Sequence, residues 1–384
     1  MRKSGLIVIT ELFLPTKGGT AVWFDAVYRR LGGKEIHVVT ANVPGAELVD
    51  SDHPNEIHRV SLRRRWWLKP ESLAMYLKLF AVSLRIGFGH RVSGVHAGRV
   101  LPEGLVGWLV ARLIGKPFVV YAHGEEITTW REPMKRRVMT FVYRHADQIV
   151  ANSEFTRTEL MRLGVAMDKI ALIAPGVDIE KFQPIAAPAR LRESLGISPS
   201  HPLILSVGRL SRRKGFDNVV RALSALRQSG LDVHYVVIGI GEDESYLRKT
   251  ARDLDLGDRV HLIGHVPVED LSFWYNTCDV FAMPNRDIDG DTEGFGMVFL
   301  EAAACGKPAV AGVAGGTGAA VVDGVTGMRV DGASVDAVAS AFRELLSSRD
   351  KAAKLGAAGY ARVLREFSWD SVARRTTQVM NGKP

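Results

Sequence analysis

Short apolar runs alternate with helix-patterned segments along this sequence, and this alternation restricts the fold more than any other feature. The runs are five or six residues long and rich in Val, Ile and Leu, as buried strands are. Segments between them, such as 218–228 and 244–254, have the apolar spacing of helices. Strands that alternate with helices predict parallel sheets in a doubly wound α/β fold. The predicted strands are residues 6–10, 36–40, 118–122, 148–152, 203–208, 234–239, 260–264 and 280–284.

A proline-containing segment around residues 175–202 interrupts the alternation, and a second series of strands begins at Leu203. The 384 residues are enough for two domains of ordinary size. The sequence therefore predicts an α/β protein with two Rossmann-like, doubly wound domains facing a cleft. Ligands of such folds bind beyond the carboxyl ends of the strands, so the loops there are where we look for chemistry. The predicted division is residues 1–180, 181–365 and 366–384.

The composition is that of a folded globular protein, with 46% apolar and 24% charged residues. The two cysteines, Cys278 and Cys305, imply no disulfide framework and fit a reducing cytoplasm. The apolar run near the N-terminus is shorter than a signal-peptide core requires. No window reaches the ~18 uninterrupted apolar residues of a membrane span. We therefore expect a cytoplasmic protein.

The net charge of +8 is confined to the first half of the chain. Residues 1–185 carry 26 Lys and Arg against 18 Asp and Glu, whereas residues 186–384 carry 24 of each kind. A basic face indicates an anionic partner, such as phospholipid, a lipid-linked phosphate or nucleic acid. The alternative is an ordinary solvated surface.

Two candidate ligand contacts follow predicted strands of the first domain. Gly18, Gly19 and Thr20 open a helix, where glycines let backbone amides approach an anion, although a plain turn uses the same residues. His123 follows strand 118–122 and can bind a sugar hydroxyl or phosphate, or a loop carbonyl instead. The glycines do not form a G-x-G-x-x-G fingerprint, and no acidic residue ends the second strand near Thr40. These absences argue against an NAD enzyme.

The first strand of the second domain leads into the basic stretch G-R-L-S-R-R-K-G. Arg209 and Lys214 lie five positions apart in this loop. Two cations that converge at a strand end suit a diphosphate, Arg by its planar fork and Lys as a point charge. We expect the neighbouring Arg212 and Arg213 to be solvated.

The stretch D-T-E-G-F-G-M-V-F-L-E follows strand 280–284. Glu293 is predicted in a loop and Glu301 in a helix that Gly306 and Pro308 end. Carboxylates accept hydrogen bonds from vicinal hydroxyls, and the amides before the helix would face a ligand. The alternatives are a solvated Glu293 and a helix-surface Glu301, or a carboxylate pair of hydrolase type. The amides in question are those of Gly294, Phe295, Gly296 and Met297.

An acidic turn lies directly upstream, where Asp289, Gly290 and Asp291 form a D-x-D sequence. Such a pair can recruit a divalent metal through nucleotide phosphates. Arg209 and Lys214 already supply positive charge, so we expect no metal.

With these motifs, the chain resembles the retaining glycosyltransferases of family four, which have the GT-B fold. The similarity covers nearly the whole length, and its last two blocks together are highly specific. One departure is V-H-A-G, where relatives often show a second histidine in place of the glycine. The blocks are G-G-T, V-H-A-G-R-V-L-P-E-G, H-G at 123–124, V-A-N-S-E-F-T, P-G-V-D-I-E-K-F, G-R-L-x-x-x-K-G and E-G-F-G-M-V-F-L-E-A-A-A-C-G-K-P.

The resemblance implies a nucleotide-sugar donor bound mainly by the second domain, without a metal or other cofactor. Arg209 and Lys214 would hold the diphosphate, and Glu293 would contact hydroxyls of the transferred sugar. Glu301 would contact the ribose, and His123 the sugar near the reacting face. It also implies that helix 366–384 crosses back onto the first domain. The remaining implied donor contacts are Gly18, Gly19, Gly239, Gly241, Gly264, His265, Val266, Gly294, Phe295, Gly296, Met297 and Val298.

The resemblance is strongest to phosphatidylinositol mannosyltransferase-type enzymes, which implies mannose from GDP-mannose and a lipid, lipid-linked or glycan acceptor. Nucleic acid is not an expected partner. The alternatives are a UDP-sugar with a soluble acceptor, an epimerase or phosphorylase of the same architecture, and a nucleotide-binding scaffold without activity. The four residues Arg209, Lys214, Glu293 and Glu301 argue against the scaffold.

A tryptophan-containing basic stretch, R-R-R-W-W-L-K-P at residues 63–70, precedes a predicted helix. Leu73, Leu77, Phe80 and Leu84 fall on one face of that helix at 3.6-residue spacing. Tryptophan and cations beside an amphipathic helix are typical of a membrane-interface segment. We therefore expect a peripheral enzyme on the inner leaflet, with packing of the stripe on the sheet as the alternative.

Overall fold

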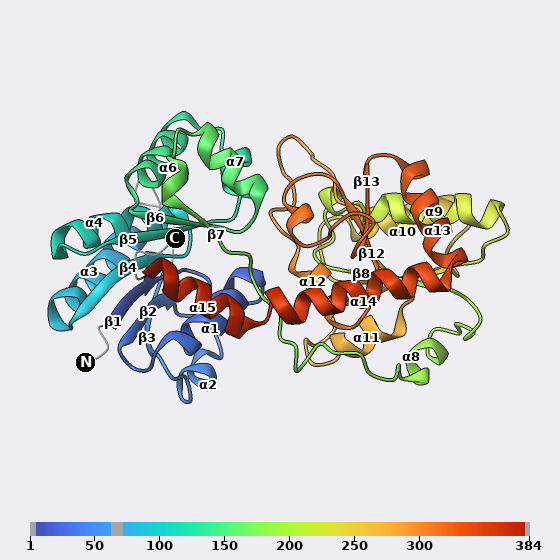
Figure 1. Cartoon of the computed structure of the whole chain (residues 1–384), viewed down its shortest axis with the longest axis horizontal. Coiled ribbons are helices and arrows are strands. Elements are labelled where there is room, and N and C mark those ends of the chain that lie inside the picture. The colour runs from blue at the N-terminus through green and yellow to red at the C-terminus, as the bar shows by residue number, and fades with distance from the viewer. Residues whose placement is uncertain (1–4, 63–71, 381–384) are drawn as a thin grey trace. The chain divides into compact units, whose positions relative to one another are not determined.

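The computed structural model describes residues 5–62 and 72–380, and its chain forms two compact units (Figure 1). The first unit comprises Met1–Pro175 together with Trp369–Pro384, and the second comprises Gly176–Ser368. Each unit contains one parallel sheet with helices on it, so the predicted fold class of two Rossmann-like α/β domains is confirmed.

The first unit is built on a seven-stranded sheet in the order β3-β2-β1-β4-β5-β6-β7. The strand order reverses direction between β1 and β4, which is where ligands of open α/β sheets bind. The predicted runs became strands because they are buried on both faces, as in β1 and β5. The strands are β1 (Gly5–Ile9), β2 (Ile36–Ala41), β3 (Glu56–Val60), β4 (Val92–Ala97), β5 (Phe118–Ala122), β6 (Gln148–Ala151) and β7 (Ile170–Leu172).

The helices of the first unit connect these parallel strands. Helix α7 begins after Ser153, whose side chain accepts the Thr156 N–H. The helices are α1 (Gly19–Leu31), α2 (Ala46–Asp50), α3 (Leu73–Gly89), α4 (Leu105–Ile114), α5 (Glu125–Thr129), α6 (Pro133–His145), α7 (Glu154–Arg162) and α15 (Trp369–Met380), with the short turns η1 (Val100–Gly104) and η2 (Met167–Lys169).

Helix α3 packs on the sheet with a face other than the stripe Leu73, Leu77, Phe80 and Leu84, for which packing on the sheet is the alternative to a membrane contact. The buried residues of α3 are Met75, Leu79, Ser83 and Ile86. Of the predicted stripe, Leu73 and Leu77 are 37% and 58% exposed. Almost every residue of α3 is apolar, so the spacing of apolar residues alone does not select the buried face. That face also includes Ser83. Residues 63–70, with both tryptophans, lie outside the described residues.

The second unit is built on a six-stranded parallel sheet in the order β10-β9-β8-β11-β12-β13, which reverses direction between β8 and β11. Its strands are β8 (Leu203–Val207), β9 (His234–Ile238), β10 (Val260–Gly264), β11 (Val280–Met283), β12 (Ala309–Gly312) and β13 (Gly327–Val330). Its helices are α8 (Ala189–Glu193), α9 (Phe216–Gln228), α10 (Glu244–Asp253), α11 (Leu271–Thr277), α12 (Met297–Ala304), α13 (Val335–Ser347) and α14 (Arg349–Glu366), with the short turns η3 (Arg212–Lys214) and η4 (Thr317–Ala319).

The chain leaves the first unit after Pro175 and returns to it at Trp369, a few positions from the predicted divisions at 180 and 365. Val177 donates its N–H to the Phe367 carbonyl at 2.8 Å, so the outgoing and returning segments lie side by side in the second unit. Helix α15 then packs on α1, where Arg30 and Asp370 form an ion pair at 2.7 Å. The last helix therefore belongs to the first unit, as the resemblance implies.

The two sheets share a histidine pair at equivalent positions. His37 on β2 lies 3.1 Å from His58 on β3, and His234 on β9 lies 3.0 Å from His261 on β10, measured between Nδ1 and Nε2. In each sheet, the second histidine pairs in register with the residue two positions after the first histidine. His58 pairs with Val39, and His261 pairs with Val236. His37 and His234 are 4% and 3% exposed.

Candidate active site

Three charged side chains meet at the carboxyl edge of the second sheet, between the loop after β8 and the loop after β11. Lys214, at the end of η3, forms an ion pair with Glu293, and Arg213 contacts the same Glu293 oxygen at 3.0 Å. The side chains of Lys214, Arg213 and Glu293 are 12%, 17% and 13% exposed. A carboxylate and two cations, all largely withdrawn from water, make a strong local field at this edge.

The pKa of Glu293 lies below its ordinary value. Burial alone would raise this pKa, but Lys214 and Arg213 lower it more strongly. Glu293 is therefore an ionised acceptor at neutral pH. Its backbone is fixed as well, because its carbonyl accepts the Gly316 N–H at 2.7 Å. A Cβ on the adjacent Gly315, whose φ is +68°, would lie 2.2 Å from that carbonyl oxygen, so only glycine fits there.

Arg209 points away from this cluster in the structure. Its side chain is 74% exposed and pairs with Glu242 at 3.1 Å. The expected convergence of Arg209 and Lys214 is thus not present in this structure. The expectation that Arg213 is solvated is wrong, because it bridges Glu293 and Asp291 and also donates to the Thr292 carbonyl at 3.2 Å. Arg212 is 41% exposed and lies over the Tyr246 ring, paired with Asp243.

The loops after β9 and β10 contain the glycines predicted near the base. A Cβ on Gly239 would lie 1.9 Å from the Gly208 oxygen, and one on Gly241 would lie 2.4 Å from the Leu210 oxygen. These two glycines therefore let the β9 loop lie against the β8 loop that carries Arg209 and Lys214. Gly264 has φ +78° and open space beside its Cα. After it come the exposed His265 and the buried Val266.

The turn between Glu293 and α12 contains the backbone amides that the sequence predicts to face a ligand. Gly296, with φ +88°, precedes α12, and Phe295 is buried at 3% exposure against Phe367. Glu301 lies within α12 and accepts the Tyr275 hydroxyl at 2.6 Å. Burial raises the pKa of Glu301 despite that hydrogen bond. Gly294, Met297 and Val298 are half-buried at the same helix start.

The acidic turn upstream is organised by its own chain. Asp287 accepts the Gly290 N–H at 2.9 Å, Ile288 and Asp291 form a bridge, and Asp291 pairs with Arg213 at 3.2 Å. Within the parts of the chain that the structure describes, no group of three or more His, Cys, Asp or Glu side chains is arranged to hold a metal ion.

In the first unit, His123 lies at the carboxyl end of β5 with a defined tautomer. Its Nε2 lies 2.8 Å from the Gly98 carbonyl, which can only accept, so Nε2 carries the proton and Nδ1 is the acceptor. Its backbone is held by Glu126, which accepts its N–H at 3.0 Å, and by Asn152, which donates to its carbonyl at 2.9 Å. Trp23 of α1 packs edge-on against the ring.

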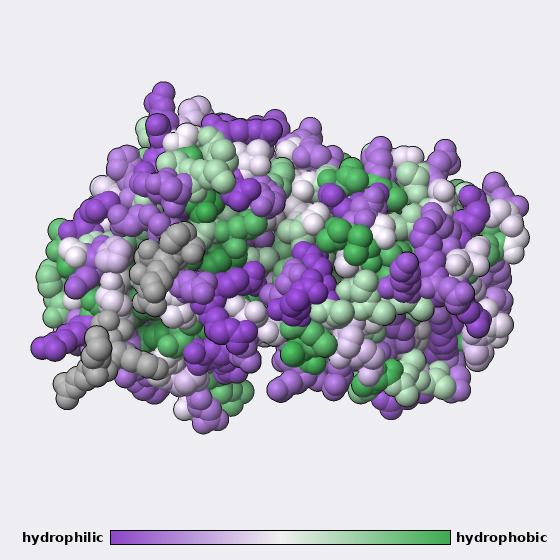
Figure 2. All heavy atoms as spheres, viewed as in Figure 1, coloured by the Kyte–Doolittle hydropathy of each residue, from purple (hydrophilic) through white to green (hydrophobic). Residues whose placement is uncertain are grey.

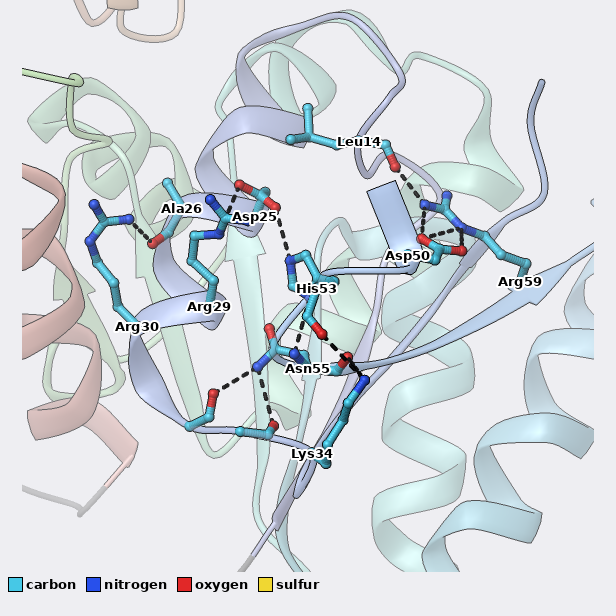
Figure 3. Close-up of polar contacts among 12 residues, drawn as sticks. Leu14, Asp25, Ala26, Arg29, Arg30, Lys34, Asp50, His53, Asn55 and Arg59 are labelled. Atoms are coloured by element: carbon cyan, nitrogen blue, oxygen red, sulfur yellow. Dashed lines mark hydrogen bonds and ion pairs between the residues drawn. The ribbon is translucent and has the colours of Figure 1, made fainter. Parts of the chain in front are cut away.

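The start of α1 brings Gly18 and Gly19 to the carboxyl end of β1. Gly18 has φ +133° and nothing within 4 Å of its added Cβ, so its backbone is open to a ligand. The loop before it is held by Arg59, which donates to the Leu14 carbonyl at 2.6 Å and binds Asp50 (Figure 3).

Helix α1 itself is held by a buried acid–histidine contact that Figure 3 also shows. Asn55 donates its N–H to His53 Nδ1 at 3.1 Å, so the proton of His53 is on Nε2 and is donated to Asp25 at 3.0 Å. His53 and Asp25 are 2% and 6% exposed. They cannot reach a substrate, and they fix the helix whose first turn carries the candidate glycines.

Sequence reasoning missed Glu103, which lies in the loop after β4. Its side chain is fully buried; one oxygen accepts the Glu11 N–H at 2.9 Å, and Oε2 has no hydrogen-bond partner among the described residues. Burial raises the pKa of Glu103 to about 7. A glutamate in P-E-G reads as an exposed turn residue, so no local signal reveals this burial.

Each unit matches a family model. The description "Glycosyltransferase Family 4" matches residues 17–181, and "Glycosyl transferases group 1" matches residues 189–362. The chain therefore belongs to the family-four glycosyltransferases, and it is a glycosyltransferase.

Individual relatives cover almost the whole chain. A GDP-mannose-dependent alpha-(1-6)-phosphatidylinositol monomannoside mannosyltransferase of Mycolicibacterium smegmatis is 32% identical over 98% of both chains. A D-inositol 3-phosphate glycosyltransferase of Xylanimonas cellulosilytica is 32% identical, covering 93% of this chain and 89% of its own. Among solved structures, Anabaena HepE in complex with UDP has a TM-score of 0.82 at 20% identity, over 98% of this chain and 100% of its own. That likeness establishes the GT-B fold.

Proposed function

We propose that this glycosyltransferase transfers mannose from GDP-mannose to a lipid or lipid-linked acceptor, with retention of configuration. The observation that carries the proposal is the contact of Lys214 and Arg213 with an ionised Glu293 beside the turn at 294–296. The identity with the mannosyltransferase relative over nearly the whole chain supports the choice of donor and acceptor.

Donor binding would replace one partner of Lys214 with another. Glu293 now neutralises Lys214, and the donor's diphosphate would take this place as the stronger anion. Released from the lysine, the ionised Glu293 can accept hydrogen bonds from hydroxyls of the sugar. The same two side chains thus serve as a charge pair before binding and as separate ligand contacts afterwards.

In the reaction, the bond between the anomeric carbon and the diphosphate oxygen breaks, and the acceptor oxygen bonds to that carbon. The proton of the acceptor hydroxyl leaves with the departing nucleoside diphosphate, so charges balance. Lys214, Arg213 and the amides before α12 would stabilise the charge that grows on the leaving phosphate. These groups supply positive charge without a metal, and we propose that none is needed.

His123 would contribute from the first unit. Its Nε2 proton is committed to the Gly98 carbonyl, so Nδ1 is the atom available to accept a hydrogen bond from a hydroxyl. That geometry suits orientation of a sugar hydroxyl by the imidazole ring.

A thermal-shift panel of nucleotide sugars, followed by a radiolabel transfer assay, tests the proposal. GDP-mannose should raise the melting temperature more than UDP-glucose does, because a ligand that binds only the folded state stabilises it. Label should then move from GDP-mannose into a lipid extract. Stabilisation by UDP-sugars alone would replace the donor, and label transfer to a water-soluble sugar alone would replace the acceptor.

The same assay separates the other enzyme class. An epimerase or phosphorylase of this architecture would convert the donor without any lipid extract, whereas the proposed transferase would not. A lipid acceptor also places the reaction at a membrane surface, and we propose that the first unit acts there on the inner leaflet. None of the helices in residues 5–62 and 72–380 is long and apolar enough to cross a membrane.

A further inference from the structure

The end of helix α14 contacts the candidate active site from two directions. Phe367, the residue after α14, packs its ring on Phe295 of the turn at 294–296, with ring centroids 6.2 Å apart. Arg362 donates to the carbonyls of Ala319 and Ala320 at 2.9 and 3.1 Å. All of these residues belong to the second unit. Two residues that the sequence does not assign to the site thus contact two of the loops that form it.

The first direction is through Phe295, which lies between Glu293 and the start of α12. Phe295 and Phe367 are each 3% exposed. The guanidinium carbon of Arg362 lies 4.9 Å from the centroid of the Phe367 ring, so the ring contacts a cation as well as Phe295. The backbone of Phe367 is fixed too, because its carbonyl accepts the Val177 N–H at 2.8 Å. Phe367 is therefore a fixed support for the turn that contains the candidate amides.

The second direction is through the loop at 315–320, which contains η4. At one end of this loop, Gly316 donates its N–H to the Glu293 carbonyl at 2.7 Å. At the other end, Arg362 binds two carbonyls, and its side chain is only 19% exposed. Arg362 also pairs with Glu366 at 3.0 Å, which fixes its position. Arg362 therefore holds the loop that supports the backbone of Glu293.

Helix α14 itself packs closely on α12. A Cβ on Gly356 would lie 2.1 Å from the Gly306 oxygen, and one on Gly359 would lie 3.3 Å from the Ala303 Cβ. Both glycines belong to the buried face of α14. Figure 2 shows hydrophilic residues among weakly apolar ones where Figure 1 places the outward face of this helix. Because the packed face admits no larger side chain at Gly356, α14 has a fixed seat, and the residues at its end are fixed with it.

We propose that Phe367 and Arg362 are positioning residues for the donor. They hold the turn at 294–296 and the backbone of Glu293 in the arrangement that binds the diphosphate and the sugar, and neither of them touches the donor. The inference rests on the proposed function only in placing the donor at Glu293, and it depends neither on the base nor on the acceptor.

The alternative is that both residues contribute to the stability of the second unit and to nothing else. Loss of packing alone would lower the free energy of unfolding and leave the nucleotide affinity of the folded protein unchanged. Loss of positioning would weaken that affinity as well, because misplaced groups bind the same ligand less tightly. The two explanations therefore differ in nucleotide affinity at matched stability.

Two matched pairs of variants of the full chain make this comparison. Phe367→Leu is matched by Phe342→Leu, since Phe342 of α13 is similarly buried in the same unit. Arg362→Gln is matched by Arg365→Gln, since Arg365 also pairs with Glu366 but is 68% exposed. Arg362→Lys keeps the charge and covers the case in which the glutamine variant does not fold.

Each variant is measured by urea unfolding and by isothermal titration calorimetry with GDP and with UDP. The two phenylalanine variants should lower the free energy of unfolding to a similar degree, because each removes buried volume. Phe367→Leu and Arg362→Gln should in addition raise the Kd of the nucleotide about tenfold, roughly the loss of one charge-assisted hydrogen bond. Arg362→Lys should give a smaller rise, and the two controls should keep the Kd of the unchanged chain.

An unchanged Kd in both Phe367→Leu and Arg362→Gln would overturn the inference. An equal rise of Kd in the controls would also overturn it, because the effect would then follow from lost stability. A rise in only one of the two variants would overturn the role of the other residue.

The proposed function is judged on the unchanged chain. Binding of UDP in preference to GDP would reject the proposed donor and leave the positioning test intact, because both nucleotides carry the diphosphate. Binding of GDP and transfer of mannose, with no difference between the variants and their controls, would do the reverse. If the unchanged chain bound neither nucleotide, both proposals would be overturned.

Discussion

Lys214 and Glu293, which are 79 positions apart in the sequence, form a largely buried ion pair at the carboxyl edge of the second sheet. The pair joins the two loops that the family motifs occupy. Removal of either partner is costly, because the buried charge that remains loses a counter-charge: without Lys214, Glu293 keeps only its contact with Arg213.

Replacement of Lys214 by alanine should therefore reduce transfer from the nucleotide sugar by at least about tenfold, since a charge-assisted hydrogen bond to phosphate contributes roughly 1.5–3 kcal/mol. The measurement is kcat/KM for the donor. Arg212→Ala is the matched control, because Arg212 lies two positions away and pairs with Asp243 instead. Near-native activity of the Lys214 variant would remove the diphosphate assignment.

Chelation of divalent metals should leave the reaction unchanged. In the proposed donor site, Lys214 and Arg213, which now contact Glu293, would supply the positive charge that a metal otherwise brings to the donor phosphates. The check is the transfer rate with excess EDTA, before and after added Mg²⁺ or Mn²⁺. Loss of activity that the metal restores would reinstate Asp289 and Asp291 as ligands.

Glu103 should make the folded state less stable as pH rises. Its folded pKa of about 7 lies above the ordinary value of 4.5, so the folded state holds a proton that the unfolded state has released. Between pH 4.5 and 7 the free energy of unfolding should fall, by up to about 3 kcal/mol from this group.

Glu103→Gln tests this dependence, because glutamine keeps the shape and cannot ionise. Its free energy of unfolding, measured with urea, should be higher than that of the unchanged chain above pH 7. Below pH 5 it should be no higher. Parallel pH profiles for the two proteins would contradict the assignment.

The two histidine pairs should lower the free energy of unfolding as pH falls, which is opposite to the effect of Glu103. Burial, and then the neighbouring histidines, lower the pKa of His37 and of His234 from 6.5 to about 4. The unfolded chain binds protons at these positions first, so stability should be lost as pH falls from about 6.5 to 4. His234→Gln should flatten the acid limb of the unfolding free energy measured by urea titration. An unchanged acid limb would show that the pair does not titrate in this way.

Much of the fold could be predicted because buried parallel strands are continuous apolar runs. The five missed strands lack that signal. Polar or small residues interrupt β4, V-S-G-V-H-A, and β13, G-M-R-V. β3, E-I-H-R-V, lies at a sheet edge and is only partly buried, and β7 has three residues. β12, A-V-A-G, is too short and too rich in small residues to stand out.

Some residues of the candidate site could be predicted from the sequence and others could not. The motif positions Lys214 and Glu293 could be found from residue type and position after a strand. The role of Arg213 could not, because Arg212, Arg213 and Lys214 are chemically alike in the sequence. Only the η3 turn sends Arg212 to Asp243 and the two residues after it to Glu293.

The return of α15 to the first unit also has a consequence for biosynthesis. The second unit is continuous in the chain, from Gly176 to Ser368, so its whole sequence is translated before α15 exists. The first unit, although it is translated first, waits for Trp369–Met380 to cover α1 and to pair Asp370 with Arg30. On the ribosome, therefore, the N-terminal half is expected to be the last part of this enzyme to reach its final structure.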